Sequence, residues 1–127
     1  MIFEEDLDFK ISSQIEIDKE NFEIAKKGMY EVMHGEKGTA RSWGRKLKYK
    51  MAGKTGTAQV FSTKGEIDYE NEDTPEHLKD HGLFVGYAPY DNPKIAVFVI
   101  VEHGEGASSA IPIATKITET FQIMIIS

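Results

Sequence analysis

Seven consecutive apolar residues, from Ile95 to Val101, constrain the fold of this chain more than any other segment. They read Ile-Ala-Val-Phe-Val-Ile-Val, and a short run rich in β-branched and aromatic residues is typical of a β-strand. Residues 91–93, Asp-Asn-Pro, have strong turn chemistry, and residues 82–90 before them also read as a strand. The two strands are therefore predicted to form a hairpin. Because the run 95–101 is unbroken, we expect its strand to be buried on both faces.

Helical spacing appears on both sides of this hairpin in the sequence. Asp18 can cap a helix that runs to about His34, and one face of that helix should be core, with Phe22, Ala25, Met29 and Val32 recurring on it. A final helix is expected from about Ser109, with Pro112 in its first turn. The apolar face of this helix is predicted from Ala114, Ile117, Phe121 and Ile125.

The remaining segments complete an α+β pattern. Residues 47–61 read as an extended segment, and residues 64–81 as an acidic, turn-rich insertion with one helical turn at 76–80. Residues 1–20 are poorly assigned, because the sequence before the Asp18 cap has no clear pattern. We therefore predict an α+β fold, with an antiparallel three-stranded sheet and flanking helices, in a single segment that spans residues 1–127.

The extended segment 47–61 carries the most informative motif, Lys54-Thr55-Gly56-Thr57. Its order suits recognition of a carboxylate at a strand edge, because Lys54 supplies a positive charge and Thr55 a hydroxyl donor. Gly56 has no side chain to obstruct a ligand whose backbone lies against the strand. A basic cluster surrounds the motif and indicates a local anion site; it consists of Arg41, Arg45, Lys46, Lys48, Lys50 and Lys54.

Composition excludes several classes of function. The formal net charge of −6 argues against a nucleic-acid surface, which would be basic overall. The chain has no cysteine, so disulfides and thiolate metal sites are excluded, and we expect neither a cofactor nor a metal. The acidic start lacks the pattern of a signal peptide, and no apolar run approaches the roughly 20 residues that span a bilayer.

Two other kinds of binding site have partial support in the sequence, a nucleotide-binding loop and a zinc site. Gly53-Lys54-Thr55 resembles the end of a nucleotide-binding P-loop, but that motif needs a glycine where Lys48 stands and a helix immediately afterwards. His77 and His81 stand four apart, which on a helix would place both on one face as zinc ligands. No third ligand is evident for such a zinc site.

The motif and the segments around it occur in an order that is specific for one family. These segments are Gly28-Met29, Gly38-Thr39-Ala40, the row from Tyr49 to Val60, Asp80-His81, the row from Ala88 to Pro93, Ala96-Val97 and Glu102-His103-Gly104. With them, from about Asn21 to Ile125, the chain resembles the C-terminal part of the transpeptidase domain of class B penicillin-binding proteins. The resemblance is strongest to the elongation-type group called penicillin-binding protein 2. It implies an incomplete form of the fold shared by penicillin-binding proteins and serine β-lactamases.

The resemblance also implies roles for the four residues of the motif, which match the Lys-Thr-Gly motif of these enzymes. Lys54 and Thr57 would be catalytic: Lys54 acts electrostatically on the substrate carboxylate and the nucleophile's hydrogen-bond network, and the Thr57 N–H is one oxyanion donor. Thr55 and Gly56 would bind substrate, with Thr55 bonded to the carboxylate of a D-Ala-D-Ala stem peptide or of a β-lactam. The parent protein would be anchored in the inner membrane, act on the periplasmic side and build the peptidoglycan cell wall.

The sequence departs from the family pattern at the nucleophile. No serine is followed by lysine three residues later or by asparagine two residues later, so the Ser-x-x-Lys and Ser-x-Asn motifs are both absent. We therefore expect the chain to be catalytically inactive alone and to need the earlier part of the transpeptidase domain. Without it, the apolar strand 95–101 should promote self-association. The alternatives are a non-catalytic module that binds a carboxylate or peptide, and a gene remnant without function.

Overall fold

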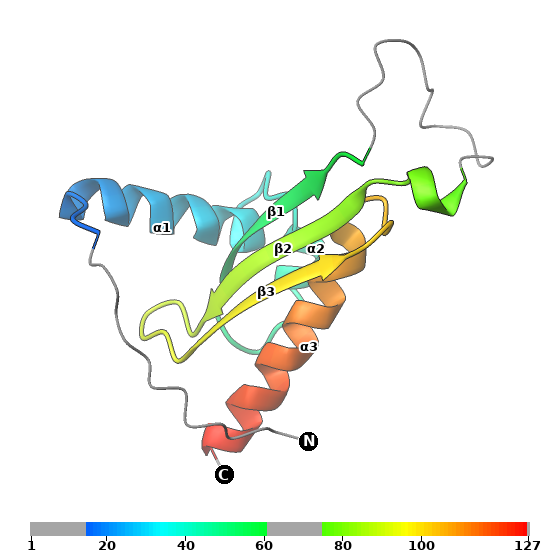
Figure 1. Cartoon of the computed structure of the whole chain (residues 1–127). Helices are drawn as coiled ribbons and strands as arrows, with labels where there is room; N and C mark the ends of the chain where they lie inside the picture. Colours follow the sequence, from blue (N-terminus) through cyan, green and yellow to red (C-terminus); the bar gives the residue numbers. More distant parts are fainter. Residues whose placement is uncertain (1–14, 61–74, 127) are drawn as a thin grey trace, which may run out of the picture.

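The computed structural model describes residues 15–60 and 75–126. Its centre is a three-stranded antiparallel sheet with the strand order β1-β2-β3 (Figure 1). The strands are β1 (Ala52–Ala58), β2 (His81–Ala88) and β3 (Ile95–Val101), and the helices are α1 (Lys19–His34), α2 (Arg41–Gly44), the 3₁₀ turn η1 (Glu76–Leu78) and α3 (Ala107–Ile126). The predicted α+β class, the three strands and the β2–β3 hairpin are confirmed. The predicted insertion, residues 64–81, lies outside the described residues at 64–74.

Helix α1 begins and ends where the sequence indicates, but only its C-terminal end is packed. The Asp18 carboxylate accepts a hydrogen bond from the Glu20 N–H at 3.2 Å, which caps the first turn. Met33 is fully buried, whereas Phe22 is 51% exposed and Ala25 is also exposed. The prediction of a continuous core face was therefore wrong for the first half of the helix. Only the later turns of α1 lie against the sheet and α2 (Figure 1).

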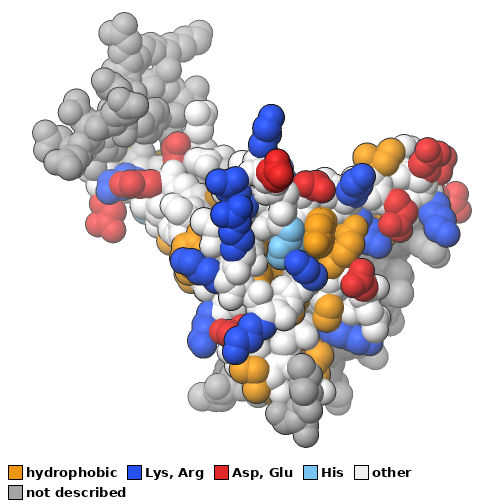
Figure 2. Space-filling view, turned by 180° about the vertical axis from the view of Figure 1, so that it is seen from behind, with side chains coloured by type: hydrophobic (Ala, Val, Ile, Leu, Met, Phe, Trp, Pro, Cys, Tyr) orange, Lys and Arg blue, Asp and Glu red, His pale blue; other side chains and the backbone are white. Residues whose placement is uncertain are grey.

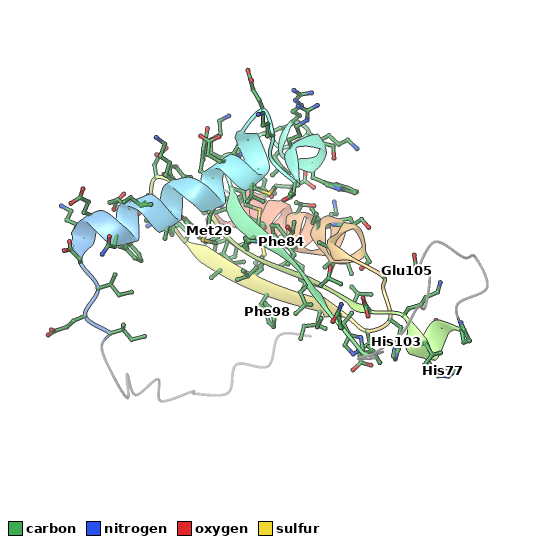
Figure 3. The ribbon with its side chains drawn as sticks, turned by 90° about the horizontal axis from the view of Figure 1, so that it is seen from above. Met29, His77, Phe84, Phe98, His103 and Glu105 are labelled. Atoms are coloured by element: carbon green, nitrogen blue, oxygen red, sulfur yellow. The ribbon has the colours of Figure 1, made fainter. Side chains whose placement is uncertain are left out.

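Strand β3 is buried on one face, not on two as its apolar sequence suggested. Val99 is 8% exposed, but its neighbours Phe98 and Ile100 are 62% and 52% exposed. Side chains alternate between the faces of a strand, and α3 covers the face that carries Val99. Within the described residues nothing covers the other face, where Phe98 points away from the helices (Figure 3).

Helix α3 packs mainly through small and polar residues. Buried residues recur at every fourth position, at Ala110, Ala114, Thr118 and Gln122, and Ile111 and Thr115 are buried beside them. The Thr118 hydroxyl donates to the Ala114 carbonyl at 2.8 Å, so this buried polar group is satisfied. Of the predicted apolar face, Ala114 is buried, but Ile117 and Ile125 are 45% and 49% exposed. That prediction was therefore only partly right.

The start of α3 also lies two residues earlier than predicted. The helix begins at Ala107, which puts Pro112 beyond the first turn, where its missing N–H removes one intrahelical hydrogen bond. Although α3 is long and rich in isoleucine, none of the helices in the described residues is long and apolar enough to cross a membrane.

Two side chains fix the chain just before β1. The Tyr49 hydroxyl donates to the Thr115 carbonyl of α3 at 3.1 Å, and burial raises the pKa of Tyr49 to about 12. The Met51 N–H donates to Nε2 of His34 at the end of α1, at 3.3 Å. Burial, followed by the positive charge of Lys50, lowers the pKa of His34, and a neutral ring keeps that nitrogen available as an acceptor. Strand β1 is thus held by both long helices.

Candidate functional site

The Lys54–Thr57 motif lies within β1, an edge strand of the sheet in the described residues. Lys54 stands opposite Val85 of β2, and Thr57 stands opposite Gly82. An edge strand leaves one row of backbone donors and acceptors unpaired along its outer side. This position therefore leaves both side chains and backbone groups of the motif available to a ligand, as a carboxylate site requires.

Lys54 lies on the sheet face that carries the exposed apolar residues. Its side chain is exposed, and Nζ donates to the Thr55 carbonyl at 2.6 Å. Val85, directly opposite, is 39% exposed, and Phe98 stands opposite Val85 on β3. In the row Lys54, Val85 and Phe98, which runs across the three described strands, the Lys54 ammonium is therefore a charge beside two apolar side chains. Its attraction for an anion would increase if the face were shielded from water.

Thr55 is paired with Thr39, a residue outside the Lys54–Thr57 motif. The hydroxyl oxygens of Thr39 and Thr55 lie 3.1 Å apart, and either one can donate. Thr39 follows α1, and the Ala40 N–H donates to the Val32 carbonyl at 3.0 Å, which holds this turn against the helix. If Thr39 donates to Thr55, the Thr55 proton is free for a carboxylate. The only sequence signal for this contact was the Gly38-Thr39-Ala40 row.

Gly56 and Thr57 form the end of the motif, and the fold leaves space around both. A Cβ added to Gly56 would meet only the Leu83 Cβ, at 3.4 Å, which is an ordinary contact. Thr57 is exposed, and a Cβ added to Gly106, just before α3, would lie 4.0 Å from its hydroxyl. The fold itself therefore does not require glycine at position 56, which leaves ligand approach as a reason for it.

The basic cluster lies beside the motif and is mostly exposed. Seen from behind, Lys and Arg side chains gather over the middle of the molecule, around α2 (Figure 2). Some of them have local partners: Arg41 donates to the Glu36 carbonyl, and Lys46 Nζ lies 4.8 Å from the centre of the Trp43 ring. Lys48 and Lys50 are exposed on the approach to β1. A role of the cluster in guiding an anion stays a prediction.

The two rival sites lack the structural context that they need. Gly53-Lys54-Thr55 lies inside β1, whereas a P-loop lysine opens a helix. His77 lies in η1 and His81 in β2, so they do not share one helical face. Across residues 15–60 and 75–126, no group of three or more suitable side chains could hold a metal ion.

The comparisons with known proteins agree on one family. Residues 4–119 match the family model of the penicillin-binding protein transpeptidase domain. The peptidoglycan D,D-transpeptidase MrdA of Haemophilus influenzae is 46% identical over 101 residues, which are 79% of this chain and 16% of that protein. The protein of the same name from Escherichia coli is 44% identical over 90 residues, which are 71% of this chain and 14% of that protein. The chain thus spans about a sixth of the length of these relatives.

Solved structures show the same likeness in three dimensions. Penicillin-binding protein 2 of Pseudomonas aeruginosa, in complex with WCK 5153, is 39% identical with a TM-score of 0.68, covering 85% of this chain and 21% of that one. Penicillin-binding protein 2 of Helicobacter pylori, in complex with MreC, is 31% identical with a TM-score of 0.69, covering 83% and 18%. By sequence and by fold, the chain belongs to the transpeptidase-domain family of the penicillin-binding proteins.

Proposed function

We propose that residues 1–127 are the C-terminal part of the transpeptidase domain of a peptidoglycan D,D-transpeptidase, and that they supply the Lys54–Thr57 side of its active site. The observation that carries the proposal is the edge position of β1, with a charged Lys54 and a Thr55 hydroxyl supported by Thr39 at 3.1 Å. A carboxylate ligand needs such a cation and such a donor. Lys54 acts on the carboxylate and the nucleophile, Thr55 and Gly56 bind substrate, and the Thr57 N–H stabilises the oxyanion.

The substrates and the location follow from the same family. The stem peptide that ends in D-Ala-D-Ala is the substrate and acylates the nucleophilic serine of the parent protein. A β-lactam acylates that same serine. That parent is anchored in the inner membrane and acts in the periplasm. The peptidoglycan substrate is supported by the relatives' shared name, peptidoglycan D,D-transpeptidase, and the β-lactam by the family model of the penicillin-binding proteins. The location is inferred from the resemblance to that family.

The uncovered sheet face is where the rest of the domain packs. It carries Lys54 together with the exposed side chains of Val85, Phe98 and Ile100. An apolar face of this kind is a common site of association with another protein segment. The nucleophile-bearing part of the domain, docked here, brings its serine to the face from which the Lys54 side chain projects.

The uncovered face leads to a prediction about the chain in isolation. In sedimentation velocity, we expect the chain to form dimers or larger species, and Phe98→Lys to shift it toward monomer, because a charge opposes burial of that face. Lys94→Glu is the control, since Lys94 is exposed just outside β3. A monomer at all concentrations with the native sequence would contradict the prediction.

A binding experiment tests the proposed function directly. We expect a D-Ala-D-Ala peptide, added to the isotope-labelled chain, to shift the NMR signals of Thr55 to Thr57 in a saturable way. Lys54→Ala should weaken binding by about tenfold, the effect of losing one charge-assisted hydrogen bond. Lys48→Ala removes the same charge from the neighbouring basic cluster and should change affinity little. If both variants bind equally well, Lys54 does not contact the carboxylate.

Thr39 gives a second, smaller effect on the same binding. Thr39→Val keeps the shape of the side chain but removes the hydroxyl that lies 3.1 Å from Thr55. We expect a loss of affinity of roughly threefold to tenfold, the usual range for one hydrogen bond. Thr39→Ser retains the hydroxyl and should bind as the native chain does. Equal affinities for the valine and serine variants would show that the Thr39–Thr55 contact has no part in binding.

A further inference from the structure

Two histidines are joined to each other and to the backbone at the Thr57 end of the sheet. His81 begins β2, and His103 lies in the turn between β3 and α3 (Figure 3). Their rings are 4.9 Å apart and meet edge to face. The backbone N–H of His103 donates to Nδ1 of His81 at 2.9 Å, and Nδ1 of His103 lies 3.0 Å from the Lys79 carbonyl. Both side chains are half-buried.

The partners of the two rings assign their protons. Nδ1 of His81 faces an N–H donor and must therefore carry a lone pair, which leaves the proton of the neutral ring on Nε2. Nδ1 of His103 faces a carbonyl, which can only accept, so this nitrogen carries a proton. The bond to His81 consequently exists only while that ring is neutral. The bond from His103 survives in both charge states of its own ring.

The turn that these bonds hold has an unfavourable backbone conformation. His103 and Glu105 have φ values of 55° and 68°, in the left-handed region that residues with a Cβ rarely adopt. Two further contacts fasten the turn to the segment before β2. The Glu105 N–H donates to the Asp80 carbonyl at 2.9 Å, and the Glu105 carboxylate pairs with Lys79. The left-handed turn thus depends on contacts with residues 79–81.

The turn lies against the end of the candidate site. A Cβ added to Gly82 would be 2.1 Å from the Gly106 carbonyl oxygen, so the backbones of these two residues are in direct contact. Gly82 is the strand partner of Thr57, and His81 is the partner of Ala58. A displacement of the turn would therefore reach the position of Thr57 through a single strand pair.

We propose that His81 and His103 form a pH-sensitive pair that positions the Thr57 end of β1. Protonation of Nδ1 of His81 replaces the acceptor with a donor that faces the N–H of His103. At its first residue, the left-handed turn then loses the bond to the His81 ring and keeps the bond from the His103 ring to the Lys79 carbonyl. An effect of this protonation on the active site rests on the proposed function of Thr57. The pH-sensitive contact between His81 and His103 does not depend on that function.

Among the described residues, the charged and titratable groups around the pair come from three segments. Glu76 and His77 lie in η1, where the Glu76 charge acts on Lys79; Lys79 and Asp80 precede β2; and Glu102 and Glu105 belong to the turn. The residues of β1 opposite the pair, 56–58, and the first four residues of α3, 107–110, contain no charged side chain. Of the residue types in this cluster, histidine is the one whose charge ordinarily changes between pH 5 and pH 8.

Hydrogen exchange of the His103 amide, followed by NMR on the full chain between pH 8 and pH 5, tests the proposal. After correction for the intrinsic exchange rate, we expect protection to fall by roughly tenfold between pH 8 and pH 5. His81→Phe keeps an aromatic ring at position 81 but has no acceptor nitrogen. In this variant the His103 amide should therefore be poorly protected at every pH. His77→Gln removes an exposed histidine of η1 and should leave the profile unchanged.

Two further readouts separate a positioning role from a structural one. His103→Asn retains the backbone N–H, and asparagine tolerates the left-handed region. The protection of the amide at position 103 should therefore depend on pH as in the native chain. The chemical shift of the Thr57 amide should change over the same pH range in the native chain. This change should be absent in His81→Phe. The proposal is overturned if protection does not depend on pH, if His81→Phe keeps the native profile, or if Thr57 does not respond. None of these measurements uses a ligand, so they can fail while carboxylate binding stands.

Discussion

Incubated with a fluorescent penicillin, the 127-residue chain is expected to acquire no covalent label. A serine acyl-enzyme needs a serine whose base lies beside it, and the sequence holds neither Ser-x-x-Lys nor Ser-x-Asn. Removal of the nucleophile from a serine hydrolase costs about a million-fold in turnover. Denaturing gel electrophoresis with fluorescence detection measures the result, and a labelled band for the chain alone would contradict it.

The same residues should support acylation inside a complete domain. The test is a chimera in which the aligned 79% of this chain replaces the matching residues of the Haemophilus influenzae relative. We expect the chimera to be labelled, and Lys54→Ala to slow labelling by roughly a hundredfold or more, because a fixed positive charge at the reacting groups is lost. Lys48→Ala is the matched control. A Lys54→Ala chimera that is labelled at the native rate would refute the assigned role of Lys54.

The order of the elements could be predicted because local signals determine it. The Asp18 cap, the turn at residues 91–93 and the apolar run 95–101 each act over a few residues, and each element that they predicted is present. The extended segment was predicted at 47–61, and within its described part, 47–60, the strand runs from Ala52 to Ala58. Residues 47–51 are held instead by Tyr49 and Met51, which contact α3 and α1, and such distant contacts leave no local pattern.

Burial was predicted less well, because it depends on which elements meet. Phe98 and Ile100 look like core residues, yet α3 covers only the opposite face of β3. Thr118 and Gln122 look like surface residues, yet they are among the buried residues of α3. The Thr39–Thr55 contact joins residues that are 16 positions apart and depends on how α1 meets β1. The motif thus located the candidate site, whereas its supporting residues required the fold.

Two glycines on either side of Lys54 are expected to respond in opposite ways to alanine. A Cβ on Gly53 would lie 2.3 Å from Cζ of Phe84 and 2.9 Å from the Val85 carbonyl oxygen. Phe84 is fully buried in the core, so its ring cannot move aside. We expect Gly53→Ala to lower the free energy of unfolding by about 1–3 kcal/mol or more, the cost of overpacking.

Gly56→Ala should leave stability unchanged, within about 0.5 kcal/mol, because its nearest neighbour would be the Leu83 Cβ at 3.4 Å. Its effect should appear in binding instead, where the new methyl group occupies the side from which a ligand's backbone approaches the strand. Urea denaturation at one protein concentration, together with titration of a D-Ala-D-Ala peptide, measures both quantities. If Gly56→Ala unfolds the chain, the fold requires this glycine. If the variant is stable and binds normally, no ligand backbone lies against Gly56. Stability lost at position 53 and affinity lost at position 56 would show that one glycine serves the core and the other serves the site.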